Sequence, residues 1–372
     1  NGAVMVYTPE YWMKSEETES GIEFIIADAE LPGYIHVPEI IGGRYMASSD
    51  GNGGVTSIAG VIPMLNTPMS TIHASAENVG MTLDDIWTYT AETVLMVVEF
   101  ATMNTQGAVG DGVSSLYRET DTDKPLTETA GANQVIAPAA FANTAIVNDI
   151  MDIGTSKGGC QLGKRIVESV ETYPDNADYK IVKFKGDPVD ITTEQFLSIH
   201  GLSNVADEAI DSKSGYIGTN GKANAYYRGR VCHANMFRYI LGVYRQGGTG
   251  HIWTARSRKD AAKYDALNTA VHRDTGCALP YKEDGNSRDE GFVKTLHYLS
   301  DLPTAPFCAS VGGNSSNPIG DYCWHPDKSA GNTVLFCGGS ADNGSNGGRF
   351  CGGWYYSAST SGWSYGALPF LK

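Results

Sequence analysis

Residue types that can do chemistry are present in this 372-residue chain, but not at the spacings that familiar reactions need. The histidines are dispersed, and no HxxxH or HExxH pair puts two imidazoles on one helix face for zinc. His233 follows Cys232 directly, and adjacent residues of a strand face opposite sides, which disfavours a Cys/His dyad. No GxSxG elbow or Walker A loop occurs. The sequence therefore predicts a protein that is not an enzyme and that uses no metal or cofactor.

Two short stretches carry weaker chemical signals. The segment DGNSRDEG (284–291) alternates oxygen-bearing side chains as a calcium loop does, but Arg288 stands where an EF-hand needs Asp or Asn. We expect a solvated acidic turn there, with calcium as the alternative. Asp84 and Asp85 lie at the start of a predicted helix, where the helix dipole explains both carboxylates without catalysis.

The cysteines are odd in number and form no CxxC pair, which argues against a zinc ribbon or a thioredoxin-like motif. We expect free thiols that pack as small buried hydrophobic side chains. One or two disulfides among the last four stay open if the protein works outside the cell. The seven are Cys160, Cys232, Cys277, Cys308, Cys323, Cys337 and Cys351.

Composition excludes several classes of protein. A formal net charge of −15 argues against a nucleic-acid partner, which needs a basic face. No apolar run approaches the roughly 18 residues of a membrane span. The first residues, NGAVMVYTPEYW, lack the features of a signal peptide, and we expect the natural protein to continue upstream. The 44 glycines favour turns and short strands over long helices.

The elements that must position any site are short strands and one long helix. Hydrophobic periodicity predicts a helix over 83–103, with Thr82 as N-cap and Asp85 at N3. Residues 107–145 are rich in Gly, Ala and Thr and are expected to be loop. We expect one irregular, loop-rich α+β domain over 1–372, with few helices, short antiparallel strands and an insertion around 160–225. The buried face of the helix is predicted to hold Ile86, Thr90, Val94, Val97, Val98 and Ala101.

The C-terminal segment from Cys337 to Leu371 combines glycines, aromatic residues and short polar side chains. Tyr and Trp give large rigid contact areas, while Ser, Gly and Asn adapt their hydrogen bonding, as in antibody-type binding surfaces. The same composition suits a glycine-rich sheet core. Composition alone leaves both interpretations open.

Several motifs resemble phage tail and tail-fibre proteins that have the C-type-lectin-like fold of formylglycine-generating enzymes. The resemblance rests on five segments: GGRYMAS (42–48), DIWTYTAETVLMVVEFATMNTQ (85–106), YRGR with ANMFRYI (227–240), GGNSSNPIGDYCW (312–324) and VLFCGGS (334–340). It departs from the enzymes where Arg238 replaces an acidic residue and where Phe237 and Tyr239 replace tryptophans. Their copper-binding cysteine pair has no matching motif here. The resemblance thus implies the fold without the enzyme's activity.

Residues 338–366 are similar to the variable region of diversity-generating retroelement target proteins, a group that includes the phage major tropism determinant. In that group a reverse transcriptase rewrites adenines in AAY-type codons. The implied fixed scaffold is Gly338, Gly339, Ser340, Gly344, Gly347, Gly348, Phe350, Ser357, Ser359, Trp363 and Gly366.

The resemblance implies a set of variable, ligand-binding positions. Nine of them carry residue types that adenine changes in AAC or AAT can produce, and Ala341 and Arg349 are included with them. Ser345, Cys351 and Gly352 are further candidate members of the set. The nine are Asp342, Asn343, Asn346, Gly353, Tyr355, Tyr356, Thr360, Gly362 and Ser364.

The function implied is receptor binding at a phage or prophage tail tip or fibre, or at the host-cell surface. The expected partner is a bacterial cell-surface protein or glycan, met outside the cell, with a homo-oligomer left open. Two alternatives remain: a copper-dependent oxidase of the formylglycine-generating type, and a virion structural module that binds no receptor.

Overall fold

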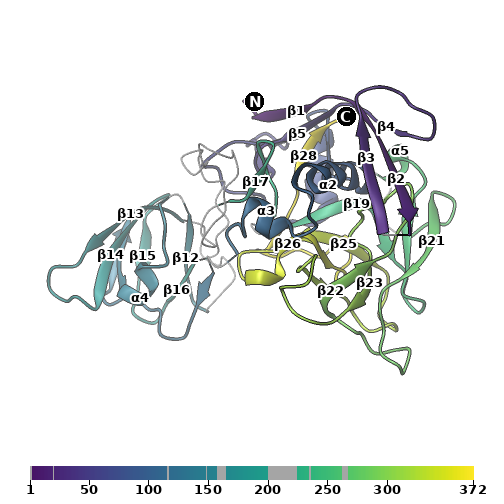
Figure 1. Cartoon of the computed structure of the whole chain (residues 1–372). Helices are drawn as coiled ribbons and strands as arrows, with labels where there is room; N and C mark the ends of the chain where they lie inside the picture. The colour runs from purple at the N-terminus through teal and green to yellow at the C-terminus, as the bar shows by residue number, and fades with distance from the viewer. Residues whose placement is uncertain are drawn as a thin grey trace.

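The computed structural model describes residues 2–19, 21–114, 117–147, 149–156, 165–199, 224–233, 236–261 and 267–372. It is mostly β-sheet, with curled sheets and few helices, which agrees with an α+β or β-rich chain. Figure 1 shows a main body that contains both termini and, beside it, a smaller body of strands from the middle of the sequence.

The main body is organised around a nine-stranded sheet in the order β21-β20-β19-β25-β26-β24-β22-β23, with β27 paired to β19. Its centre is buried, since every residue of β25 and β26 is buried. The strands are β19 (Phe237–Arg245), β20 (His251–Ala255), β21 (His272–Ala278), β22 (Gly291–Leu296), β23 (Cys308–Val311), β24 (Tyr322–Trp324), β25 (Thr333–Gly338), β26 (Gly348–Gly353) and β27 (Tyr365–Gly366).

A second sheet of the main body joins the two ends of the chain. Its order is β1-β5-β28-β8, and Phe370 of the last strand pairs with Gly42. Its strands are β1 (Met5–Thr8), β5 (Ile40–Gly43), β8 (Met81–Leu83) and β28 (Pro369–Leu371). Smaller sheets are formed by β2 (Tyr11–Thr18), β3 (Gly21–Ala27) and β4 (Ile35–Val37), by β6 (Ser48–Ser49) and β7 (Val55–Thr56), and by β17 (Tyr226–Tyr227) and β18 (Arg230–Val231).

The long helix α2 spans Ile86–Phe100, which is shorter than the predicted 83–103. Its N-cap is Asp85, not Thr82, and the Asp85 carboxylate accepts hydrogen bonds from the backbone N–H groups of Trp87 and Thr88. The predicted start was wrong because residues 81–83 pair with β28 as strand β8. The predicted buried face is correct except at its end, where Val98 is 40% exposed and Ala101 is exposed in a left-handed C-cap. The other helices are α1 (Met69–Glu77), α3 (Thr105–Val109), α4 (Ala139–Ala142) and α5 (Arg258–Ala261).

The smaller body is a six-stranded antiparallel sheet with its own hydrophobic core, in the order β11-β14-β13-β12-β16-β9 (Figure 1). Its described strands lie between residues 118 and 199, so it overlaps the predicted insertion around 160–225 only in part. Residues 200–223 lie outside the described residues. The strands are β9 (Arg118–Glu119), β11 (Gln134–Pro138), β12 (Ile150–Gly154), β13 (Arg165–Thr172), β14 (Tyr179–Lys185) and β16 (Phe196–Ile199), and β10 (Thr129–Ala132) pairs with β15 (Val189–Ile191) beside them.

The prediction of loop for 107–145 was wrong, because this range contains three strands, helix α4 and the second half of helix α3. Its small residues do not prevent packing. Ala132, Ala137 and Ala142 are buried in the core of the smaller body, where a small side chain lets neighbouring elements approach closely.

Candidate ligand-binding site

The backbone of residues 338–348 is a hairpin connection that glycines make feasible. Gly339 has φ +78°, and a Cβ there would lie 2.7 Å from the Cα of Gly347. The turn that follows is closed by Asn343, whose Oδ1 accepts a hydrogen bond from the backbone N–H of Ser340 at 2.7 Å. A short 3-10 helix, η2 (Gly344–Asn346), leads into β26. The scaffold glycine at 339 therefore fixes the path that the neighbouring predicted positions follow.

This connection rests on residues 105–114 and on the smaller body. The backbone N–H of Gly344 donates to the carbonyl of Ser114 at 2.8 Å, and Gln106 Nε2 donates to the carbonyl of Ser345 at 3.2 Å. Ala341 is fully buried in the hydrophobic core of the smaller body. In this conformation Ala341 supports the turn and has no surface with which to touch a ligand.

A hollow of about 240 Å³ opens beside the end of β26. We call it the aromatic pocket. Four of the predicted variable positions line it, together with four aromatic residues from β19, β24, β25 and β27. Its lining residues are Phe237, Trp324, Phe336, Asn343, Gly353, Tyr355, Tyr356 and Tyr365.

The rings of the aromatic pocket hold one another in inclined orientations. Phe237 and Trp324 pack edge to face, with centroids 5.9 Å apart and planes at 78°. Phe336 and Tyr356 do the same at 5.8 Å and 89°, and Tyr356 lies 5.2 Å from Tyr365. Phe336 is 1% exposed, whereas Tyr356 is 40% exposed. Phe237, Trp324 and Tyr365 are half-buried, so the pocket combines a buried to half-buried framework with a rim open to solvent.

Gly353 leaves the pocket empty at its base. It pairs with Phe336 across β25 and β26. A Cβ at this position would lie 3.5 Å from Cε1 of Phe237 and 3.7 Å from Cβ of Phe336, which are ordinary van der Waals distances. The backbone at 353 is not in the left-handed region that requires glycine. Another residue can therefore stand at 353, and its side chain would fill the space between the two rings.

Tyr355, at the rim of the pocket, contacts both members of the ion pair between Arg288 and Glu290. Its hydroxyl donates a hydrogen bond to the Glu290 carboxylate, and burial, followed by that hydrogen bond, raises the pKa of the Tyr355 phenol. The guanidinium carbon of Arg288 lies 5.4 Å from the centre of the Tyr355 ring, and Arg288 also pairs with Glu290 at 3.5 Å. The pocket thus has at its rim one carboxylate that is already paired with a guanidinium.

Three further predicted positions lie in the half-buried loop between Tyr356 and β27, namely Thr360, Gly362 and Ser364. Their backbone carbonyls accept hydrogen bonds from the framework: Thr360 from the Tyr239 hydroxyl at 2.5 Å, Gly362 from the Asn66 N–H at 3.0 Å, and Ser364 from the Phe237 N–H at 2.9 Å. These three contacts use the backbone of the loop, and the Thr360 hydroxyl adds a contact with the Ser357 hydroxyl at 3.4 Å. The remaining predicted positions Asp342 and Asn346 belong to the turn before β26, where Asp342 is exposed and Asn346 half-buried.

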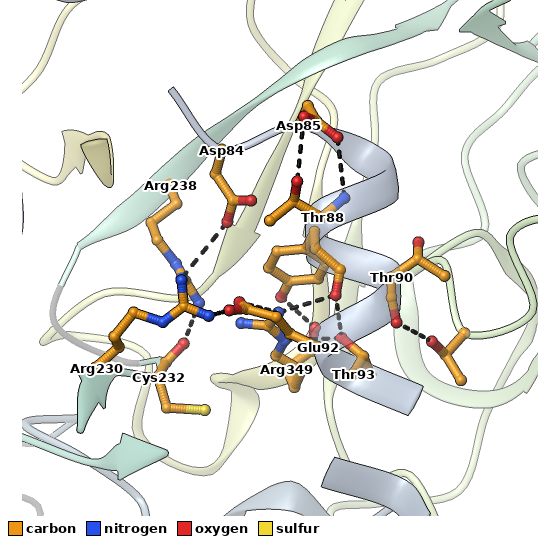
Figure 2. Close-up of polar contacts among 12 residues, drawn as sticks. Asp84, Asp85, Thr88, Thr90, Glu92, Thr93, Arg230, Cys232, Arg238 and Arg349 are labelled. Carbon is orange, nitrogen blue, oxygen red and sulfur yellow. Dashed lines mark hydrogen bonds and ion pairs between the residues drawn. The ribbon is translucent and has the colours of Figure 1, made fainter. Parts of the chain in front are cut away.

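Arg349 lies away from the surface, with 3% of its area exposed. Figure 2 shows it beside helix α2, where its Nε donates to Thr93 Oγ1 at 2.8 Å and its Nη2 donates to the Tyr89 carbonyl at 2.9 Å. Its Nη2 also pairs with Glu92 at 3.3 Å. Arg349 thus ties β26 to α2 and offers no surface to a ligand in this conformation.

Two more arginines complete this buried charge cluster, which sequence reasoning missed. Arg230 pairs with Glu92, and Arg238 pairs with Asp84 at 3.7 Å (Figure 2). Asp84 was expected to act through the helix dipole, but that interpretation holds only for Asp85, the N-cap. The available signal was the run of arginines at intervals in the apolar stretch 226–240, opposite acidic residues on an apolar helix.

Burial also changes the protonation of carboxyl groups near the cluster. It raises the pKa of Asp321 to about 8 and that of Asp84 to about 6, although nearby charged groups oppose both shifts. Asp321 Oδ2 accepts a hydrogen bond from the backbone N–H of Phe350 at 2.7 Å, which fixes β26 on its other side. The cluster and Asp321 together hold the strand that ends at Gly353.

The cysteines and the acidic segment 284–291 both lie in defined surroundings. Cys232, Cys277, Cys308, Cys323, Cys337 and Cys351 are buried free thiols, as predicted, while Cys160 lies outside the described residues. Asp284 accepts hydrogen bonds from the backbone N–H groups of Asn286 and Ser287 at 2.8 Å, so these residues form a turn. Over the residues that the structure describes, no group of three or more His, Cys, Asp or Glu side chains is placed to hold a metal ion.

No protein-family model matches the chain, and no curated protein matches it either. Among the described helices, none is long and apolar enough to cross a membrane.

Proposed function

We propose that this protein is a ligand-binding variable protein of a diversity-generating retroelement, with a C-type-lectin-like fold. It acts as a receptor-binding protein of a phage or prophage tail and binds a bacterial surface protein or glycan without catalysis. The observation that carries the proposal is the aromatic pocket, because four predicted variable positions gather there on a framework of one buried ring and three half-buried rings.

The division between framework and rim supports this function. In a binding site whose residues vary, the variable positions must lie where a substitution leaves the core packed. A change of side-chain volume in the core lowers the free energy of unfolding by about 1–5 kcal/mol. Tyr356 is exposed, and Gly353 has room for a side chain. Exposed tyrosines around a pocket are also typical of binding hot spots.

The proposal is tested with a triple variant, Tyr355→Ala, Tyr356→Ala and Asp342→Ala. Fluorescently labelled protein is applied to a panel of bacterial cells and binding is measured by flow cytometry. We expect loss of cell binding with a thermal unfolding midpoint close to that of the parent. Tyr7→Ala is the matched control, since Tyr7 is 58% exposed on β1 and lies outside the aromatic pocket. A triple variant that folds and binds cells as the parent does would overturn the proposal.

The oxidase alternative depends on reactive thiols, and the environment of the cysteines bears on it. A hydrogen bond with Cys308, followed by burial, raises the pKa of the Cys323 thiol, and burial raises that of Cys351. Thiols held protonated in this way are poor nucleophiles in the metal-free protein. Because a bound metal deprotonates its thiol ligands, stoichiometric uptake of copper by the pure protein would instead favour the oxidase.

A further inference from the structure

The aromatic pocket has the composition of a cation-binding cage, and we propose that it takes one alkylated ammonium group from its ligand. This inference rests on the proposed function, since it concerns the same pocket. It adds the chemical class of the group that enters: a trimethylammonium head or an alkylated lysine side chain.

The lining supplies the attraction. Six aromatic rings surround the hollow, and no lining side chain carries a positive charge. A cation within about 6 Å of an aromatic ring is attracted by the ring quadrupole, and aromatic cages recognise quaternary ammonium groups in this way. The edge-to-face pairs Phe237–Trp324 and Phe336–Tyr356 differ in ring orientation, so the walls present faces in more than one direction.

The size of the hollow limits what enters. Its volume is about 240 Å³, which is below the roughly 300–1,000 Å³ of pockets that hold drug-sized ligands. One compact group fits, while the rest of the ligand stays at the rim formed by Tyr355 and Tyr356.

The attraction for a cation comes from the rings, since the charges at the rim offset each other. The Glu290 carboxylate accepts a hydrogen bond from the Tyr355 hydroxyl and pairs with Arg288 at 3.5 Å. The Arg288 guanidinium lies over the Tyr355 ring at 5.4 Å, so one ring of this pocket already makes a cation–π contact. A neutral group of the same shape would gain only the burial of its apolar surface.

Gly353 sets the depth of the cage. Because a Cβ there lies 3.5 Å from the Phe237 ring, the longer side chain of Asn occupies the space between Phe237 and Phe336. Gly353→Asn is therefore expected to exclude the ammonium group while the strand pairing of β25 and β26 is retained.

The experiment compares choline with 3,3-dimethyl-1-butanol, its uncharged isostere, by isothermal titration calorimetry. We expect choline to bind at least tenfold more tightly than the isostere. Gly353→Asn and Tyr356→Ala should each weaken choline binding at least tenfold, and Tyr7→Ala should leave it unchanged. A cooperative thermal unfolding transition establishes that each variant is folded. If Gly353→Asn does not fold, Tyr356→Ala still tests the pocket, because Tyr356 is exposed and its removal leaves the core packed.

Equal affinity for choline and its isostere, no binding of choline, or binding that survives both variants would overturn the inference. Phosphocholine and N-trimethyl-lysine, titrated in parallel, distinguish a lipid or glycan head group from a methylated protein, and tighter binding of either one supports the inference. The two proposals fail separately. Loss of cell binding in the pocket variants without choline binding would reject only the cage, and choline binding with unchanged cell binding would reject only the receptor function.

Discussion

Gly353 and Phe336 stand opposite each other in the β25–β26 pair, and the space above the glycine is the base of the aromatic pocket. Phe336 is 1% exposed and belongs to the framework, whereas Gly353 is a predicted variable position with room for a side chain. One strand pair thus places a fixed ring beside an exchangeable residue. This arrangement lets the shape of the pocket change while the sheet beneath it does not.

Gly339→Ala should destabilise the protein by more than about 2 kcal/mol, because φ +78° strains any other residue and the new Cβ would lie 2.7 Å from the Gly347 Cα. Urea unfolding measures the change. Gly331→Ala is the control: no atom lies within 4 Å of a Cβ there, and we expect a change within about 0.5 kcal/mol. Equal stability of the two variants would contradict the role given to Gly339.

Arg349→Met should cost about 1.5–3 kcal/mol of unfolding free energy, since it removes the hydrogen bonds to Thr93 and to the Tyr89 carbonyl while Glu92 keeps its ion pair with Arg230. The exposed pair Arg228–Glu99 is the comparison, and Arg228→Ala should cost no more than about 1 kcal/mol. Both are measured by urea denaturation. An Arg349→Met variant as stable as the parent would contradict the structural role of Arg349 between β26 and α2.

The raised pKa of Asp321 makes stability depend on pH. With a folded pKa of about 8 against an ordinary value of 3.8, the folded protein binds a proton that the unfolded chain releases. Stability should therefore fall as pH rises from 6.5 to 8, and level off above that. Asp321→Asn, which mimics the neutral acid, should flatten this slope in urea unfolding measured across the range. A parent whose stability rises over this window would contradict the assignment.

The buried thiols should resist modification in the folded protein. Burial raises the pKa of Cys337 and Cys351, so the thiolate that reacts with Ellman's reagent is scarce. We expect the six described cysteines to react slowly in native protein and rapidly in guanidinium. Reductant should leave the unfolding midpoint unchanged, and a large decrease would instead reveal a disulfide.

Local features of the sequence predicted the local features of the structure. The body of helix α2 and the thiols were predictable because periodicity and hydrophobicity report on a residue's own surroundings. The predicted start of the helix was wrong because Met81–Leu83 pairs with Pro369–Leu371, the last strand of the chain, which local sequence cannot reveal.

The site was predictable in part for the same reason. The resemblance singled out Gly353, Tyr355 and Tyr356, which line one pocket, but it also included Arg349, whose burial depends on Glu92. Trp324 and Phe336 come from other strands of the sheet, and only their meeting in space makes them members of the pocket.

The central claim is that residues around the aromatic pocket are rewritten by a retroelement. Sequencing the DNA that flanks the gene tests it most directly. The account predicts a near-copy of codons 338–366, close to a reverse-transcriptase gene, that differs only where the copy carries adenine, with the codons of Gly353, Tyr355 and Tyr356 among the differences. A flank without such a copy, or a copy that differs at the codons of Gly339 and Phe350 instead, would contradict it.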